Sequence, residues 1–144
     1  MAILNEEEQE QVVHAVSVAE NMTSGEIRVV VENVVGEGKT AIEKAQQYFE
    51  ELHMHKTALR NGVLLYVAIA DHQFSIIGDA GINDRVAVDF WENTKEKMLI
   101  HFRKGEYAAG LVTGIHDVGQ QLHYFFPRKE DDVNELPNDI HFGN

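Results

Sequence analysis

The chain has 144 residues, enough for one domain with one ordinary hydrophobic core. Its 12 lysines and arginines against 24 aspartates and glutamates give a net charge of −12, which argues against nucleic acid and anionic membranes as partners, because both are bound through cations. The absence of cysteine excludes disulfides, thiolate nucleophiles and cysteine-ligated metals. The N-terminus shows no leader pattern, and no run of about 18 apolar residues follows. We therefore expect a cytoplasmic protein.

The first predicted element is a helix over residues 5–22. Asn5, with Glu8 three positions on, has the spacing of a capping box. The apolar residues of this segment recur at helical intervals and define one buried face: Val12, Val16 and Ala19. A valine-rich run at residues 27–32 follows and predicts a strand.

A second helix is predicted over residues 40–52, because Thr40 and Glu43 repeat the capping-box spacing. Its expected buried face consists of Ile42, Ala45, Phe49 and Leu52. The continuous apolar run at residues 62–69 predicts a strand buried on both faces and, with a helix in between, parallel to the first strand. A short reversal then leads into an antiparallel third strand at residues 74–77.

The second half of the chain is mostly helical. A loop rich in glycine and aspartate covers residues 78–85, and helices are predicted at about 87–103 and 107–125. Helices before, between and after a small mixed sheet predict an α/β fold, a three-layer α/β/α sandwich with three to four strands, the fourth of which the sequence does not place. We expect a single domain over residues 1–126, with the acidic tail at 127–144 packing on it or trailing from it.

The strand directions bring acidic residues from distant parts of the chain together. The two parallel strands begin, and the antiparallel strand ends, at one edge of the sheet, here called the N-terminal edge. Carboxylates that meet there repel by about 4 kcal/mol per close pair, and a hard divalent cation removes this repulsion. We therefore predict a site for Ca²⁺ or Mg²⁺, whose candidate ligands are Glu26, Asp79, Asn83, Asp84 and Asp89.

The same acids have an interpretation without metal. Asp79 and Asp84 suit turns, and Asp89 suits the first turn of a helix, where the dipole favours negative charge. An EF-hand does not explain them, because Gly81 and Phe90 stand at the third and twelfth positions counted from Asp79. The residues alone leave both interpretations open.

Two further patterns point to other ligands. Three positions before the second helix match the dinucleotide-binding pattern G-x-G-x-x-A: Gly36, Gly38 and Ala41. Asp71, at the end of the second strand, would then contact the ribose, although any short strand-to-helix turn uses such glycines. The pairs His53–His55 and His116–His123 suit transition metals but have no third ligand at a recognisable spacing, and ordinary surface histidines explain them equally.

Several stretches, taken in order, resemble the TPM domain family in its stand-alone flavobacterial form: residues 23–29, 54–57, 60–64, 77–83, 89–91 and 134–137. The resemblance covers nearly the whole chain. It implies an α/β/α sandwich in which two long loops, here about residues 54–61 and 78–88, cross and are pinned by a divalent metal. Thylakoid members linked to photosystem II repair are described as acid phosphatases, but no nucleophile of an established family motif is found here, so no catalytic residue is carried over.

Together these observations predict a metal-binding TPM domain whose crossing loops are ordered by a divalent cation, Ca²⁺ first and Mg²⁺ second. Such a domain would serve as a metal-responsive regulatory or interaction module, and any protein partner is expected to be basic because the ends of the chain are acidic. The alternative is a metal-dependent phosphomonoesterase resembling an acid phosphatase. Asp132, Asn134 and Glu135 would add oxygen ligands if the tail folds back.

Overall fold

The computed structural model describes residues 4–128 and 140–143. Its elements are, in order, α1 (Glu6–Glu20), β1 (Glu26–Glu32), α2 (Ala41–Glu51), the 3-10 turn η1 (Met54–Lys56), β2 (Gly62–Ala68), β3 (Gln73–Gly78), α3 (Ala80–Asn83), α4 (Phe90–Phe102), α5 (Tyr107–Phe125) and β4 (His141–Phe142). Both predicted capping boxes are present, at Asn5 for α1 and at Thr40 for α2.

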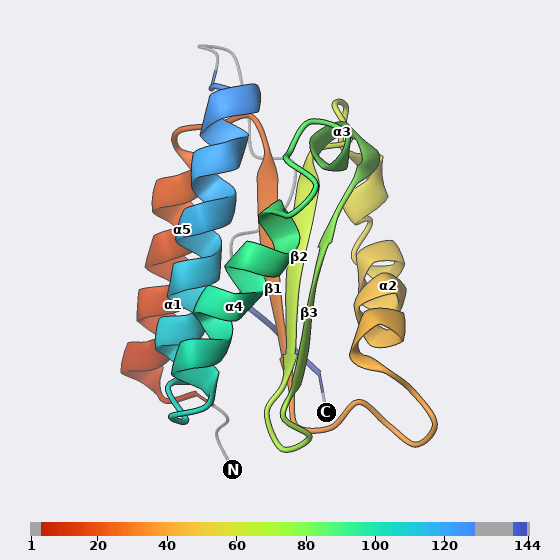
Figure 1. The fold of residues 1–144 in the computed structure, drawn as a ribbon, viewed down its shortest axis with the longest axis vertical. Helices are drawn as coiled ribbons and strands as arrows, with labels where there is room; N and C mark the ends of the chain where they lie inside the picture. Colours follow the sequence, from red (N-terminus) through yellow and green to blue (C-terminus); the bar gives the residue numbers. More distant parts are fainter. Residues whose placement is uncertain (1–3, 129–139, 144) are drawn as a thin grey trace.

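The sheet lies between two helical layers. Its strand order is β3-β2-β1-β4, with β1 parallel to β2 and β4, and with β3 antiparallel to β2. Helices α1, α4 and α5 cover one face, and α2 covers the other (Figure 1). The predicted α/β fold with a small mixed sheet is therefore confirmed.

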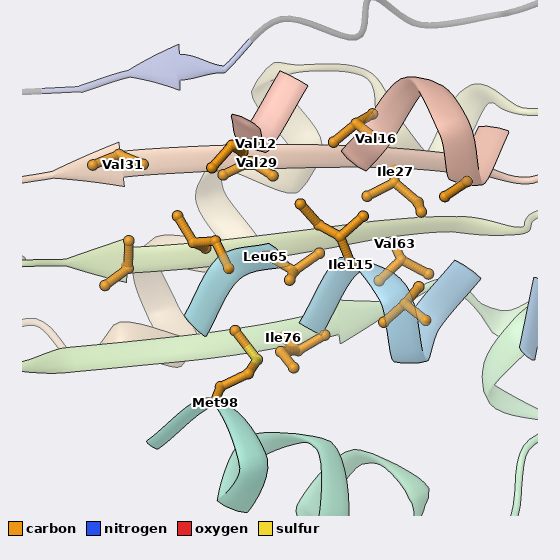
Figure 2. Packing of buried hydrophobic residues seen from close by; sticks show 14 of the residues in the cluster. Val12, Val16, Ile27, Val29, Val31, Val63, Leu65, Ile76, Met98 and Ile115 are labelled. Carbon is orange, nitrogen blue, oxygen red and sulfur yellow. The ribbon is translucent and has the colours of Figure 1, made fainter. Parts of the chain in front are cut away.

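Two hydrophobic cores follow from the alternation of side chains along the strands. On β1, Ile27, Val29 and Val31 join the larger core under α1, α4 and α5, whereas Val30 joins the smaller core under α2. Ile115 from α5 packs into the larger core (Figure 2). Every residue of β2 is buried, which explains why this strand is a continuous apolar run in the sequence.

The buried face predicted for α2 was partly wrong. Ala45 is buried as expected, but Ile42 is 46% exposed, and Tyr48 is buried instead. Tyr48 faces the sheet because its hydroxyl donates a hydrogen bond to Glu32 of β1. A polar contact across the core therefore sets the rotation of this helix, which apolar spacing alone does not reveal.

Three other boundaries differ from the prediction. The loop predicted at residues 78–85 contains the short helix α3, and the helix expected from residue 87 begins at Phe90. The fourth strand is β4, which pairs with β1 at Val30 and Val31 from within the expected tail. Two residues are too few to show a strand period. The tail residues Asp132, Asn134 and Glu135 lie outside the described residues.

No helix in the described part of the chain combines the length and the apolar character needed to cross a lipid bilayer. The cytoplasmic location expected from the sequence stays a prediction.

Candidate functional site

The three strands meet at the N-terminal edge in the arrangement that their directions predicted. In the parallel pair, Glu26 lies opposite Gly62, and in the antiparallel pair Gly78 lies opposite Val63. The backbone N–H of Asp79 donates to the carbonyl of Gly62 at 2.9 Å, on the other side of β2 from Glu26. The backbones of Glu26 and Asp79 are thus about two strand spacings, roughly 10 Å, apart.

The two loops expected to cross are in contact. Arg60 holds Asp79 with two parallel bonds, from Nε to Oδ2 at 2.7 Å and from Nη2 to Oδ1 at 2.8 Å. The N–H of Gly81 donates to the carbonyl of Arg60 at 2.7 Å, and a Cβ on Gly81 would lie 2.5 Å from that oxygen. Only glycine allows this approach, so the backbone of the second loop lies directly against the first.

In this arrangement the predicted metal ligands contact different neighbouring residues and not one common point. Both oxygens of Asp79 are bound to Arg60, and Oδ1 also accepts the N–H of Ala80 at the start of α3. Asn83 accepts a hydrogen bond from Trp91 Nε1 at 2.8 Å. Asp84 ends α3, Asp89 precedes α4, and both are exposed. The turn interpretation therefore describes the structural roles of Asp79 and Asp84, and metal ligation by the predicted set stays a prediction.

A different pair of acids is buried at this edge. Glu20, the last residue of α1, and Glu26, the first of β1, are each 1% exposed. Oε2 of Glu20 accepts a hydrogen bond from the N–H of Ile27 at 2.6 Å. This carboxyl oxygen thus replaces the carbonyl that a neighbouring strand would offer to this N–H of β1. The carboxyl groups of Glu20 and Glu26 lie close enough that the charge of Glu26 raises the pKa of Glu20.

Burial determines which state of Glu20 is stable. Desolvation, more than any other cause, together with the nearby charge of Glu26, raises the pKa of Glu20 from its ordinary 4.5 to about 9. The Ile27 N–H and Arg128 oppose the shift, with smaller effects. At neutral pH the carboxyl group of Glu20 is therefore protonated in the folded protein.

The backbone of Asn61 adjoins this pair. Its backbone carbonyl accepts the N–H of Glu26 at 3.3 Å, and Nδ2 lies 3.5 Å from the hydroxyl of Ser24. The side-chain oxygen of Asn61 is buried and has no hydrogen-bond donor among the described residues, and the same holds for Oε1 of Glu20 and the hydroxyl of Thr57. Buried acceptors without a donor are rare in native proteins and point to water or an ion.

Glu20 and Asn61 were missed from the sequence, although one signal for Glu20 was present. Val12, Val16 and Ala19 define the buried face of α1, and Glu20 follows Val16 by four residues, on the same face. An acid on the apolar face of a helix is expected to be buried. A buried carboxyl group needs a proton or a cation to neutralise its charge. Asn61 gave no signal, because its burial depends on how the loop before β2 is folded.

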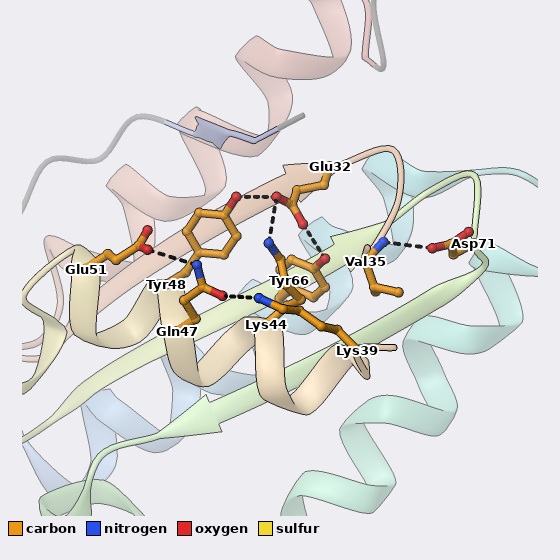
Figure 3. A network of polar contacts seen from close by, with 9 residues as sticks. All are labelled: Glu32, Val35, Lys39, Lys44, Gln47, Tyr48, Glu51, Tyr66 and Asp71. Carbon is orange, nitrogen blue, oxygen red and sulfur yellow. Dashed lines mark hydrogen bonds and ion pairs between the residues drawn. The ribbon is translucent and has the colours of Figure 1, made fainter. Parts of the chain in front are cut away.

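Another buried acid, Glu32, lies at the opposite end of β1 (Figure 3). Glu32 is 1% exposed, accepts hydrogen bonds from the hydroxyls of Tyr48 and Tyr66, and lies 3.6 Å from Lys44 Nζ. Burial, followed by these bonds, raises the pKa of both tyrosines above its ordinary value. Because both oxygens of this carboxylate have donors, the cluster fixes α2 on the sheet.

Two of the other candidates, Asp71 and His123, have structural roles in the described residues. Asp71, the predicted ribose contact, accepts the N–H of Val35 at 2.7 Å and ties the loop after β1 to the β2–β3 turn. His123 lies with Nδ1 2.8 Å from the carbonyl of Met22. Within residues 4–128 and 140–143, no three histidine, aspartate or glutamate side chains are grouped so that they could hold a metal ion.

Comparisons with known proteins agree with the geometry. The family model of the TPM domain matches residues 1–121. The chain belongs to the TPM domain family. It is 44% identical to the BA42 protein of the psychrophilic bacterium Bizionia argentinensis, whose NMR structure superimposes with a TM-score of 0.89 over 97% of this chain and 95% of that one.

Two more distant solved structures share the fold alone. The N-terminal domain of a P. gingivalis protein is 20% identical, with a TM-score of 0.67 over 84% of this chain and 77% of that one. The N-terminal domain of the cg2496 protein of Corynebacterium glutamicum is 12% identical, with a TM-score of 0.65 over 83% and 74%. Proteins of curated function gave no match.

Proposed function

We propose that this TPM domain binds a divalent cation of the Ca²⁺ or Mg²⁺ type at the N-terminal edge of its sheet. The observation that supports it is the buried pair of Glu20 and Glu26 next to the backbone of Asn61, whose side-chain oxygen is also buried and has no donor among the described residues. Carboxylate and amide oxygens are the ligands that these cations prefer.

The donor set fits such an ion in charge as well as in atom type. A cation that displaces the proton of Glu20 would meet two carboxylates. The amide oxygen of Asn61, backbone carbonyls and water would complete a shell of six to eight oxygens for Ca²⁺. Of the ligands predicted from the sequence, Glu26 belongs to this set. Asp79 would join only if Arg60 released it, since Arg60 occupies both of its oxygens.

Cation binding at this place would act on the crossing loops. Asn61 lies directly after Arg60, which contacts Asp79 and Gly81 of the second loop. A cation that fixes Asn61 therefore also fixes the loop that carries Arg60. The domain would then respond to metal concentration through the order of its two loops, as expected for a regulatory or interaction module.

A thermal melt in EDTA, repeated with millimolar Ca²⁺ or Mg²⁺, tests the proposal. A ligand at a hundredfold excess over its dissociation constant stabilises the folded state by about 2.7 kcal/mol, a shift of roughly 5–10 °C for a domain of this size. Glu26→Gln should remove most of the shift. Asp84→Asn, an exposed acid of the same edge, is the matched control and should keep it.

Two results would count against the proposal. An unchanged melting temperature with every divalent ion would exclude a site of useful affinity. A shift that survives Glu26→Gln but disappears with Asp84→Asn would move the site to the exposed acids of the second loop.

The phosphomonoesterase alternative remains a separate prediction. It expects turnover of a generic aryl phosphate that depends on the same ion, because the cation would polarise phosphate and activate water. Wild-type protein and Glu26→Gln, purified in parallel, separate the two functions. Equal residual rates would indicate a contaminating phosphatase, and a metal-dependent rate lost in the variant would support the enzyme.

A further inference from the structure

A small pocket lies at the end of the sheet opposite the N-terminal edge. It is formed where the turn between β2 and β3, the C-terminal end of α4 and the first residue of α5 meet, and its volume is about 90 Å³. We call it the α4–β3 pocket. Figure 1 shows the β2–β3 turn at the far end of the strands from α3. The length of β2, about 20 Å of extended chain, separates this pocket from the proposed cation site, so the two are independent.

The walls of the α4–β3 pocket are apolar. The rings of Phe74 and Phe102 meet edge to face with their centroids 4.9 Å apart, and the ring of Tyr107 stacks on Phe102 at 5.4 Å. Leu99 lines the pocket beside them. Phe102 belongs to the larger core, and the other three side chains pack against that core. Because the core holds these walls in place, the pocket is preformed, as most small-molecule sites are.

The rim of the pocket is cationic. It is lined by Arg103, at the end of α4, and by His72, in the β2–β3 turn, and both residues are exposed. In the part of the chain that the structure describes, no carboxylate pairs with Arg103, although the chain has 24 acids against 12 lysines and arginines. The acid nearest to it in sequence, Glu106, lies 3.2 Å from His101 Nδ1. The guanidinium donors of Arg103 can therefore bind an anion, and the ring of His72 adds a further donor.

Charge and size together define the ligand. A guanidinium binds a carboxylate through two parallel hydrogen bonds, and aromatic walls suit an apolar body. The volume is smaller than that of a cavity of about 150 Å³ that takes benzene, and it equals about three water molecules of roughly 30 Å³ each, so it holds about three or four carbon atoms. We propose that the α4–β3 pocket binds a short-chain aliphatic carboxylate, with its carbon chain against Phe74 and Phe102 and its carboxylate on Arg103.

The test uses the full chain, labelled with ¹⁵N and kept in EDTA so that divalent cations play no part. Sodium butyrate is the probe. Amide shift changes should centre on residues 72–74, 99–103 and 107, with a dissociation constant on the order of 1 mM, which a ligand of this size can reach. Butanol, which lacks the charge, and acetate, which lacks most of the carbon chain, should each bind at least about tenfold more weakly.

The charge on the rim is tested by substitution in the same titration. Arg103→Gln removes the cation and should weaken butyrate binding about tenfold or more, because hydrogen bonds between charged groups are the strong ones. Since Arg103 is exposed, this change leaves the fold intact. Lys104→Gln is the matched control, because Lys104 is the next residue, is also exposed and does not line the pocket. It should change the affinity less than about twofold.

Size is tested on the wall of the pocket. Leu99→Ala enlarges the pocket and should shift its preference from butyrate to the longer hexanoate. Three results would overturn the proposal: equal binding of butyrate and butanol, an equal loss of affinity with Lys104→Gln, or an unchanged preference in Leu99→Ala. The lack of shift changes at the pocket in butyrate on the order of 50 mM, or changes centred on the N-terminal edge, would overturn it as well.

Discussion

Replacing Glu20 by glutamine should remove most of the pH dependence of this domain's stability between pH 5 and 8. In the folded protein, burial raises the pKa of Glu20 to about 9, whereas in the unfolded chain it returns to about 4.5. Between these values the folded state holds a proton that the unfolded state has lost, so raising the pH favours unfolding. Glutamine keeps the acceptor for the Ile27 N–H and, like the protonated acid, can donate to Glu26.

The magnitude follows from one proton of difference. Each pH unit contributes about 1.4 kcal/mol, so between pH 5 and pH 7 the wild type should lose about 3 kcal/mol relative to Glu20→Gln. Urea unfolding followed by circular dichroism at pH 5, 6, 7 and 8, in EDTA to exclude metal, measures the difference. Glu50→Gln, an exposed acid of α2, is the control and should follow the wild type. Parallel curves for wild type and Glu20→Gln would show that Glu20 is already ionised in the folded protein.

Three further substitutions test other parts of the structure. Glu32→Ala leaves two buried tyrosine hydroxyls and Lys44 without their acceptor. It should lower the free energy of unfolding, measured in urea, by about 3 kcal/mol, and Glu32→Gln should lower it by less. Gly81→Ala places a Cβ against the carbonyl of Arg60 and should cost about 2 kcal/mol in the same assay; no loss would mean that the loops do not approach this closely. Asp79→Asn removes the ion pair with Arg60 and should speed amide exchange in residues 57–61 and 79–83 while leaving the Ca²⁺ shift in place; loss of that shift would make Asp79 a ligand.

The layers of this fold could be predicted because their signals are local. The apolar run of β2 and the two capping boxes lie within short stretches of sequence. A crossover helix between β1 and β2 and a tight turn between β2 and β3 give the strand directions. That Glu26 and Asp79 stand at the same edge of the sheet follows from those directions alone. The sequence therefore predicted which strand ends lie together.

The pairing of side chains at that edge could not be predicted, because it depends on contacts between distant residues. Nothing near Asp79 shows that Arg60, nineteen residues earlier, binds both of its oxygens. Glu20 closes the open side of β1, a role that exists only once the sheet has formed. The rotation of α2 has the same origin, since the hydroxyl of Tyr48 turns inward to reach Glu32 on another element.

Crystals soaked in Ca²⁺ and measured for its anomalous signal give the most direct test of cation binding. The proposal predicts a peak at the N-terminal edge, about 2.3–2.6 Å from a carboxylate oxygen of Glu26, with Asn61 Oδ1 in the same coordination shell. A peak coordinated only by Asp84 or Asp89, or the lack of any peak at this edge under saturating Ca²⁺, would contradict it.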